Sequence, residues 1–347
     1  MKSDFKVMLT ALAVMIVMGV VSSWVCFQAV KAERQVRYKG MMKITSEKIS
    51  KTIRGMEMNA MNVFDEVGKH HDTPESVILA LECKTSLNPD VRGYFAAFEP
   101  DYFPEKGRWF EPYVHQNANN MFEVSQVGSA RHDYTKSEWY LRAKDWSKTT
   151  EKDASKETNA SEGFWSEPYY YQDNDEIGIS GYYCTFVKPI LDEDNRLACV
   201  CGADMTLEWL VAELKKIDSE MMEEEGGLMK GSPFGDTQEF YSVILNKDGT
   251  CIAHPDGKRV TMVDDPIVSD LEQKKSGVVD MKVNGISSTV YYGPIDYIDW
   301  SVAVIVPKQM ILNPLLFLGL IFILTSIAGV LVIWWIVRRG KMNVDSA

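Results

Sequence analysis

A chain of 347 residues is too long for one ordinary hydrophobic core, so we expect two globular modules and additional segments. The net charge of −12 disfavours nucleic acid and anionic lipid surfaces as partners.

Two runs without any charged residue lie near the ends of the chain, at residues 7–30 and 310–337. A helix of about 24 residues reaches roughly 36 Å, which is enough to cross a hydrocarbon core of about 30 Å. The first run is longer than the apolar part of a signal peptide and ends without a small-x-small cleavage site, which favours a retained anchor. Both runs are therefore predicted to be transmembrane helices.

The flanking charges predict the orientation of these helices. Lys2 and Lys6 precede the first run, and Arg338, Arg339 and Lys341 follow the second, so both tails are expected in the cytoplasm. The tails carry these five basic residues and two acidic ones, a balance of +3, which leaves −15 for the loop between the runs. The sequence predicts a two-pass inner (plasma) membrane protein with residues 31–309 on the extracytoplasmic, periplasmic side.

Residues 31–67 contain no proline and are predicted to form one long helix. Its apolar positions repeat mostly at steps of three and four, as a heptad seam: Met42, Ile49, Ile53, Met56, Ala60, Val63 and Val67. A seam needs a partner surface. The spacing fits both the same seam in a parallel homodimer and the sheets of the same chain.

The next part of the chain reads as a module of strands and helices. Thr73 and Pro74 are typical of an N-cap followed by a first-turn proline, so a short helix is expected after them. Strands are expected over residues 93–98, 109–114, 179–190 and 196–204, with a helix over 206–222. Residues 146–164 have no apolar period and read as a loop or weak helix, and residues 228–236 as a linker.

A second module begins at residues 240–245, which are followed by the hairpin turn Asn246-Lys247-Asp248-Gly249. Further strands over 250–256, 278–283, 287–292 and 300–306 complete a sheet of about five antiparallel strands, with a helix over 264–274. Segregated strands and helices are typical of α+β modules.

No catalytic, metal or cofactor pattern stands out in the sequence. The five histidines and six cysteines lack metal-ligand spacing, and no nucleotide-binding or hydrolase motif occurs. We expect the cysteines to be free buried thiols and the protein not to be an enzyme.

An ordered set of motifs runs through the loop. They are Trp139-Tyr140, Trp165-Ser166-Glu167-Pro168-Tyr169, Gly202-Ala203-Asp204-Met205-Thr206-Leu207, Asp248-Gly249 and His254-Pro255-Asp256. In these motifs the loop resembles a bacterial double Cache (dCache, PAS-like) extracytoplasmic sensor domain of a transmembrane receptor. The resemblance implies an α+β fold of two PAS-like Cache modules of antiparallel sheet on a long N-terminal helix, flanked by two transmembrane helices.

The resemblance also implies a division of the chain. We expect a cytoplasmic tail at 1–6, a transmembrane helix at 7–30, a stalk helix at 31–67, a membrane-distal Cache module at 68–227, a membrane-proximal Cache module at 228–309, a second transmembrane helix at 310–337 and a tail at 338–347.

Site residues follow from the same resemblance. In relatives that bind amino acids, a tyrosine, an arginine and a Trp-Tyr pair hold the carboxylate, while an aspartate before the following helix holds the amine. Here the arginine is replaced by Ser137 and that tyrosine by His132, for which Tyr134, Arg131 or Arg142 are candidate substitutes. The expected ligand-binding residues are Tyr134, Trp139, Tyr140, Tyr169, Tyr171 and Asp204. The expected ligand is small and polar, recognised through an amine more than through a carboxylate.

The chemistry of Asp204 favours the same ligand. A carboxylate in an aromatic cavity is costly unless it is paired, and a protonated amine both pairs with it and stacks on rings. The alternative is that Asp204 or Thr206 only caps the following helix, which their positions suit.

We therefore expect a sensor that binds a small molecule in its distal module and signals across the membrane, as a homodimer. The alternative is a structural or accessory membrane subunit with a non-functional pocket that acts through protein contacts. After residue 337 only about ten residues remain, too few for an output domain, so the output domain is expected to be missing or supplied in trans.

Overall fold

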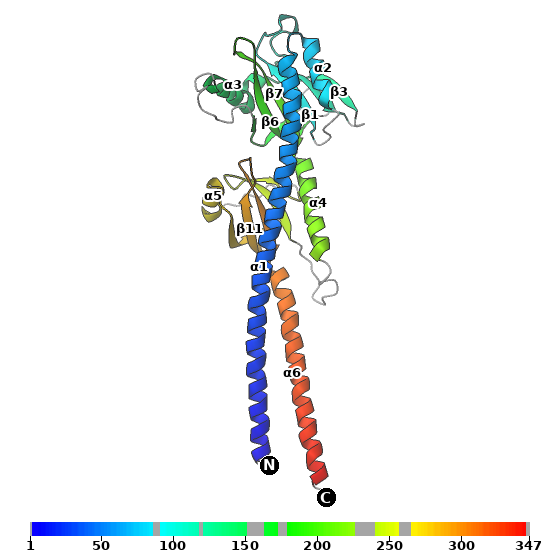
Figure 1. Cartoon of the computed structure of the whole chain (residues 1–347), viewed down its shortest axis with the longest axis vertical. Helices are drawn as coiled ribbons and strands as arrows, with labels where there is room; N and C mark the ends of the chain where they lie inside the picture. The colour runs from blue at the N-terminus through cyan, green and yellow to red at the C-terminus, as the bar shows by residue number, and fades with distance from the viewer. Residues whose placement is uncertain are drawn as a thin grey trace.

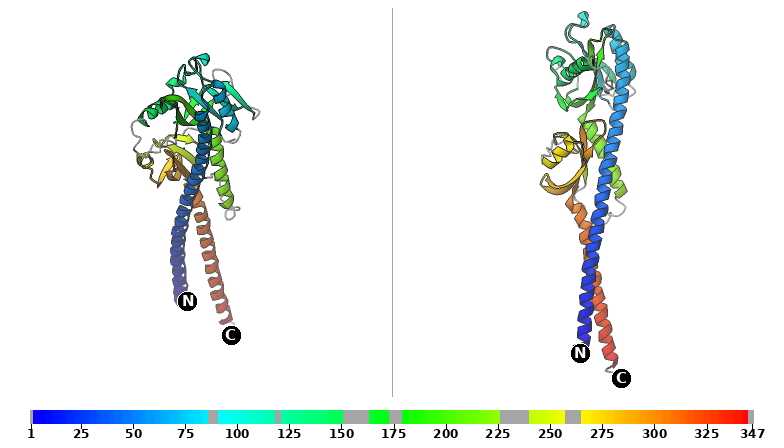
Figure 2. Two further views of the ribbon diagram at one scale, coloured as in Figure 1. Left: turned by 45° about the horizontal axis from the view of Figure 1, so that its top comes forward. Right: turned by 60° about the vertical axis from the view of Figure 1, so that its left-hand side comes forward.

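The computed structural model describes residues 2–85, 91–117, 121–150, 163–172, 179–225, 240–256 and 265–344. Two sheets follow one another along a long helix, and a second long helix runs beside the lower part of the first (Figures 1 and 2). Both chain ends lie at the same end of the molecule (Figure 1). The expected linker at 228–236, and residues 151–162 of the expected loop, lie outside the described residues.

Helix α1 (Lys2–Lys69) joins the first apolar run and the stalk without interruption. Helix α6 (Lys308–Val344) contains the second apolar run. Each has a segment long and apolar enough to cross a membrane, with a mean hydropathy of 2.0 in α1 and 2.4 in α6. Large apolar side chains such as Val17, Trp24 and Leu324 are exposed there, as a lipid-facing surface requires. Two apolar helices thus flank the sheets.

The heptad seam of α1 packs on the chain's own modules. All seven predicted seam residues are buried, in one continuous core with residues of both sheets. Ser46, the polar interruption of the seam, donates a hydrogen bond to the carbonyl oxygen of Pro294 at 2.6 Å. Of the two partner surfaces that the spacing allowed, this face of α1 uses the sheets of the same chain.

The first sheet has seven strands in the order β3-β2-β1-β7-β6-β4, with β5 also pairing with β6. Its strands are β1 (Gly93–Phe98), β2 (Pro112–Gln116), β3 (Phe122–Gln126), β4 (Phe164–Trp165), β5 (Tyr169–Tyr171), β6 (Gly181–Leu191) and β7 (Leu197–Thr206). Alternate residues of β1 and β7 enter two separate cores. One core contains α1 and α2 (Pro74–Thr85), and the other contains α3 (Glu138–Thr150).

The second sheet confirms the expected five antiparallel strands, in the order β10-β11-β12-β8-β9. Its strands are β8 (Tyr241–Asn246), β9 (Cys251–Ala253), β10 (Gly277–Val283), β11 (Ile286–Pro294) and β12 (Trp300–Pro307). Helix α5 (Asp265–Glu272) precedes β10, and α4 (Leu207–Glu225) descends from the first sheet along α1 (Figure 1). β12 leads directly into α6.

Several elements differ from the sequence-based prediction. The strand expected over 109–114 is β2, shifted to Pro112–Gln116, and β3, β4 and β5 were not predicted. β3 lies at the sheet edge and is mostly exposed, so it lacks the alternation that marks a half-buried strand. Helix α3 begins at Glu138, whereas residues before 146 were not assigned to a helix. The short helices η1 (Pro104–Lys106) and η2 (Tyr134–Lys136) complete the module.

The remaining local predictions agree with the structure. The Thr73 Oγ1 atom accepts a hydrogen bond from the backbone N–H of Ser76 at 3.2 Å, as an N-cap does. All six cysteines are free thiols; Cys184, Cys199, Cys201 and Cys251 are buried as expected, whereas Cys26 is half-buried and Cys83 is exposed.

Candidate ligand-binding site

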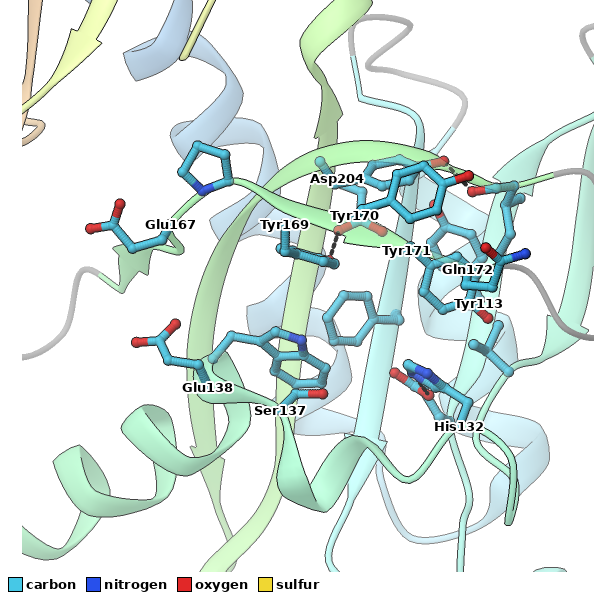
Figure 3. Close-up of a pocket in the computed structure, with 17 residues that line it drawn as sticks. Tyr113, His132, Ser137, Glu138, Glu167, Tyr169, Tyr170, Tyr171, Gln172 and Asp204 are labelled. Atoms are coloured by element: carbon cyan, nitrogen blue, oxygen red, sulfur yellow. Dashed lines mark hydrogen bonds and ion pairs between the residues drawn. The ribbon is translucent and has the colours of Figure 1, made fainter. Parts of the chain in front are cut away.

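A cavity of about 490 Å³ opens in the first module, over the α3 side of the sheet (Figure 3). β1, β2, β6 and β7 form its floor, and the start of α3 and the segment around β5 form its walls. Its lining residues are Phe95, Glu111, Tyr113, Val127, His132, Ser137, Glu138, Trp139, Glu167, Pro168, Tyr169, Tyr170, Tyr171, Gln172, Ile179, Tyr183 and Asp204. Rings dominate this list, so the walls are rigid and apolar with polar tips.

Two glycines make room for the rings of the floor. A Cβ atom at Gly202 would lie 2.1 Å from the Phe95 ring, and one at Gly93 would lie 2.6 Å from the Tyr113 ring. Gly202 stands opposite Phe95 across the β1–β7 pair, so the ring lies flat over the glycine. The glycine of the Gly202-Ala203-Asp204 motif therefore shapes the cavity two residues before the aspartate.

Asp204 is the buried carboxyl group at one end of the floor. It stands on β7 opposite Thr185 of β6, and its side chain is 8% exposed. The Thr185 hydroxyl donates to Oδ1 at 2.6 Å, and the Tyr169 hydroxyl lies 3.5 Å from the same oxygen. Burial raises the pKa of Asp204 to about 6, although these hydroxyl groups act in the opposite direction.

The residue that caps helix α4 is Thr206 and not Asp204. The Thr206 hydroxyl accepts the backbone N–H of Trp209 at 3.2 Å, which makes Thr206 the side chain that caps α4. Asp204 faces the cavity. The alternative in which Asp204 only caps the helix is therefore not what the structure shows.

Glu111 is a second buried carboxyl group, which the sequence analysis missed. It directly precedes β2, and its side chain is 4% exposed. Burial, reinforced by the charge of Asp204, raises the pKa of Glu111 well above its usual range. Burial and the same charge also raise the pKa of Tyr113 and of Tyr169. The only signal for Glu111 in the sequence is a single acidic residue inside the aromatic run Trp109-Phe110-Glu111-Pro112-Tyr113.

The structure brings four of the six predicted ligand-binding residues to the cavity: Trp139, Tyr169, Tyr171 and Asp204. Tyr134 and Tyr140 lie outside the lining. The Tyr134 hydroxyl donates to the carbonyl oxygen of Phe98 at 2.6 Å, and the Tyr140 hydroxyl donates to Glu99 Oε1 at 2.5 Å. Both rings support the wall from behind, so they correct the set of candidate contacts.

The positions that replace the family's arginine and tyrosine also line the cavity, as Ser137 and His132. Arg131 and Arg142, the candidate substitutes for the arginine, are outside the lining, and the Arg142 guanidinium lies 4.1 Å from the Phe164 ring centroid. Among the described lining residues there is no lysine or arginine. Apart from tyrosine hydroxyl groups, the titratable side chains of the lining are the carboxyl groups of Glu111, Glu138, Glu167 and Asp204 and the imidazole of His132. This composition suits a cation.

Comparison with known proteins agrees with the fold and with the position of the cavity. Residues 78–212, which include every lining residue, match the first PDC sensor domain of methyl-accepting chemotaxis protein-like proteins. The family model covers the first module, and the solved structures share the fold of both modules. No curated protein sequence matches the chain.

Solved structures share the fold of this PDC-type sensor at low identity. The ligand-binding domain of the Pseudomonas fluorescens chemoreceptor CtaA, in complex with L-leucine, is 15% identical, with a TM-score of 0.52 over 82% of this chain and 99% of that one. The domain of the Pseudomonas aeruginosa amino acid chemoreceptor PctB, in complex with L-Arg, is 16% identical, with a TM-score of 0.52 over 80% and 97%. The periplasmic sensory domain of the Campylobacter jejuni chemoreceptor Tlp1 is 12% identical, with a TM-score of 0.60 over 82% and 99%.

Proposed function

We propose that this chain is a membrane-anchored extracytoplasmic sensor that binds a small amine-bearing molecule in the cavity of its distal module and transmits occupancy across the membrane. The observation that carries this proposal is Asp204, a buried carboxyl group inside an aromatic cavity whose described lining has no lysine or arginine. A protonated amine offsets the cost of ionising this group and stacks on the surrounding rings. The chemoreceptor domains CtaA and PctB, which share the fold, are in complex with L-leucine and L-Arg, each of which carries an amine.

The cavity wall also supports the signalling part of the proposal, because the segment from β4 to β5 touches three parts of the molecule. Tyr169 and Glu167 line the cavity. The Trp165 indole N–H donates to Glu57 of α1 at 2.8 Å, and the Asn246 amide of the second sheet donates to Glu167 at 2.7 Å. A ligand that moves this wall therefore acts on the stalk helix and on the proximal module at once.

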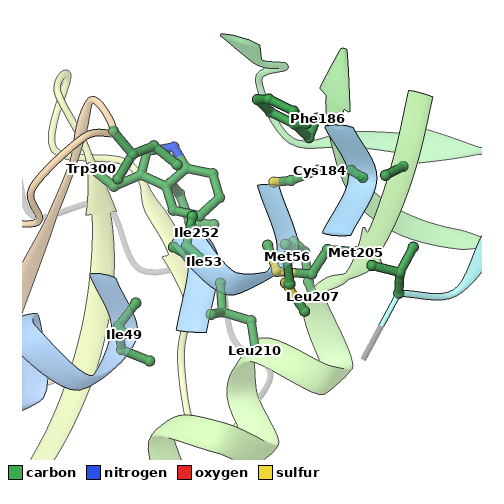
Figure 4. Close-up of a cluster of buried hydrophobic side chains, with 14 of the residues drawn as sticks. Ile49, Ile53, Met56, Cys184, Phe186, Met205, Leu207, Leu210, Ile252 and Trp300 are labelled. Carbon is green, nitrogen blue, oxygen red and sulfur yellow. The ribbon is translucent and has the colours of Figure 1, made fainter. Parts of the chain in front are cut away.

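The hydrophobic core between the two modules transmits a movement of the cavity wall. Ile49, Ile53 and Met56 of α1 pack together with Leu210 of α4 and with Trp300 of β12 (Figure 4). A densely packed core shifts between discrete arrangements and does not deform continuously. We propose that occupancy changes the arrangement of α1 against β12, which leads into α6.

The location and assembly follow from the same proposal. Residues 31–309 are proposed to lie in the periplasm, with modules at 68–227 and 228–309 and with both tails in the cytoplasm. Val36, Ile44 and Met58 are exposed along α1 and offer a contact for a second copy of the chain. The output domain is proposed to follow α6 or to act in trans.

The first test is amine-dependent stabilisation of the full-length chain in detergent micelles. We expect a set of primary amines and amino acids to include compounds that raise the melting temperature, because a ligand at 100 times its Kd adds about 2.7 kcal/mol. Asp204→Asn should abolish the increase, since it removes the charge that pairs with the ammonium group, while Glu105→Gln, an exposed change outside the cavity, should preserve it. Alcohols of the same length serve as uncharged controls.

Two results would count against the proposal. Stabilisation that survives Asp204→Asn would place the amine elsewhere. Failure of every amine, together with a membrane protein that co-purifies with the wild-type chain and the variant alike, would favour an accessory subunit.

A further inference from the structure

Glu111 lies in the cavity with one carboxyl oxygen that has no hydrogen-bond partner among the described residues. Its Oε2 atom is buried and accepts no hydrogen bond from the described residues. His132 Nε2 lies 3.5 Å from this oxygen, beyond the length of a good hydrogen bond. Buried carboxyl groups are normally bonded, so an unused oxygen in a cavity wall points to an acceptor kept for a ligand.

The strand register places Glu111 far from Asp204 along the floor. Gly93 of β1 pairs with Asp204 on β7 at one side and with His115 on β2 at the other. Glu111 lies four residues before His115 in the chain. Four residues at about 3.3 Å and two strand spacings at about 4.8 Å put the α-carbons of Asp204 and Glu111 roughly 16 Å apart. Because the side chains of both residues reach into the cavity, their carboxyl groups stand at its two ends.

The space between these ends is apolar and aromatic. Phe95 and Tyr113 cover the floor there, and Trp139 lies against Phe95 with ring centroids 4.9 Å apart. A single ammonium group within hydrogen-bond distance of one carboxyl group cannot reach the other. A short hydrocarbon chain over the rings, with a nitrogen donor at each end, matches this arrangement.

We propose that Glu111 is a second recognition residue and that the ligand is a diamine-type molecule, with one protonated nitrogen at Asp204 and the other at Glu111. This inference rests on the proposed amine-sensing function and specifies its ligand class. His132 stands beside the Glu111 end, with its ring 5.0 Å from the Tyr171 ring, and the two close that end of the cavity. Burial raises the pKa of Glu111 in the empty cavity, and a cation at this end favours the release of its proton.

The test compares matched pairs of probes by calorimetry on the full-length chain in micelles. The probes are diaminoalkanes with four to six carbons, each paired with the monoamine of the same length. We expect the best diamine to bind at least about tenfold more tightly than its monoamine, since a charge-assisted hydrogen bond contributes this much or more. We also expect Glu111→Gln to remove that advantage, with a change of less than about threefold for the monoamine.

Three further variants separate the possible outcomes. Asp204→Asn should weaken both members of each pair, and Glu105→Gln should weaken neither. Glu111→Asp keeps the charge but shortens the side chain, so it should shift the preference towards a longer diamine, and this readout does not depend on Glu111→Gln folding. Wild-type diamine binding should also release protons, seen as binding enthalpies that differ between buffers, and Glu111→Gln should reduce this release.

The two proposals fail in different ways. If monoamines bind as tightly as every diamine and lose affinity in Asp204→Asn, the inference about Glu111 is overturned while amine sensing stands. Equal loss of monoamine and diamine affinity in Glu111→Gln also overturns it, because Glu111 would then contact the same nitrogen as Asp204. If no probe binds, both proposals are overturned.

Discussion

The ionised form of Asp204 costs more free energy in the empty protein than in the proposed complex with an amine. Burial raises its pKa to about 6 from an ordinary value of 3.8. Between these two values the folded protein keeps a proton that the unfolded chain has released, so the free energy of unfolding falls as the pH rises. Above pH 6 the full cost of the buried charge remains, until a cation offsets it.

This cost predicts that Asp204→Asn stabilises the empty protein above pH 6. Asparagine still accepts the hydrogen bonds of Thr185 and Tyr169 through its Oδ1 atom but carries no charge. A pKa difference of about two units corresponds to roughly 3 kcal/mol, and partial hydration of the cavity reduces the gain to about 2 kcal/mol. Melting temperatures of wild-type chain and variant should differ by several degrees at pH 8 and converge at pH 4. A variant less stable than wild type at pH 8 would show that the ionised Asp204 side chain does not destabilise the folded protein.

The same pKa predicts how monoamine binding depends on pH. An ammonium group needs the ionised form of Asp204, so the Kd should fall about tenfold per pH unit up to about pH 6 and then level off. Other titratable groups that interact with Asp204 are Glu111, Tyr113, Tyr169, Tyr183 and Cys184. Repeating the titration in Glu111→Gln removes the contribution of the second carboxyl group, which lies beside His132. A Kd that stays constant from pH 5 to pH 8 would contradict the assignment.

Candidate recognition residues were predictable only where a motif marked them. Asp204 and Trp139 follow from the order of motifs, but Glu111 stands alone in an aromatic run and becomes visible only when the strands are paired. Tyr140 illustrates the opposite error. It follows Trp139 in α3, and neighbouring residues of a helix point about 100° apart, so Glu138 and Trp139 line the cavity while Tyr140 points away from it.

Among the elements, the antiparallel pair of β1 and β7 defines the shape of the cavity floor. Gly202→Ala should destabilise the protein by about 3 kcal/mol or more and weaken amine binding, because the new methyl group displaces the Phe95 ring into the cavity. Gly55→Ala is the matched control, since nothing lies within 4 Å of its Cβ position in α1. That change should stabilise the protein by about 0.5–1 kcal/mol through helix propensity. Thermal melting and calorimetry measure both effects, and equal stability of the two variants would contradict the proposed packing.

Elements with a buried face were predictable, and elements without one were not. β1, β7 and the five strands of the second sheet carry buried apolar residues and were expected close to their observed bounds. β3 is an exposed edge strand, and its pairing with β2 depends on a contact that local sequence does not encode. The seam of α1 was visible as a pattern, but its partner surface required the tertiary structure.

For the molecule as a whole, the bond between Glu167 and Asn246 joins the cavity to the second sheet. Asn246→Asp keeps the oxygen that accepts the backbone N–H of Lys247 but replaces the amide donor with a carboxylate beside Glu167. We expect amine affinity to change by less than about threefold, because Asn246 is outside the cavity. Amine-induced protection of β8 and β12 from hydrogen–deuterium exchange should be reduced. Asn195→Asp, in the exposed turn between β6 and β7, is the control, and unchanged protection in Asn246→Asp would exclude this route.

The unbroken backbone of α1 makes this helix a lever. The two modules hold its upper part, and from Tyr38 down to Ala13 the helix continues for about 38 Å. A tilt of about 1.5 degrees at the modules moves the lower end by about 1 Å, a displacement comparable to helix shifts in known switches. A small change in the position of the modules therefore reaches the apolar end of α1 without any hinge in the helix.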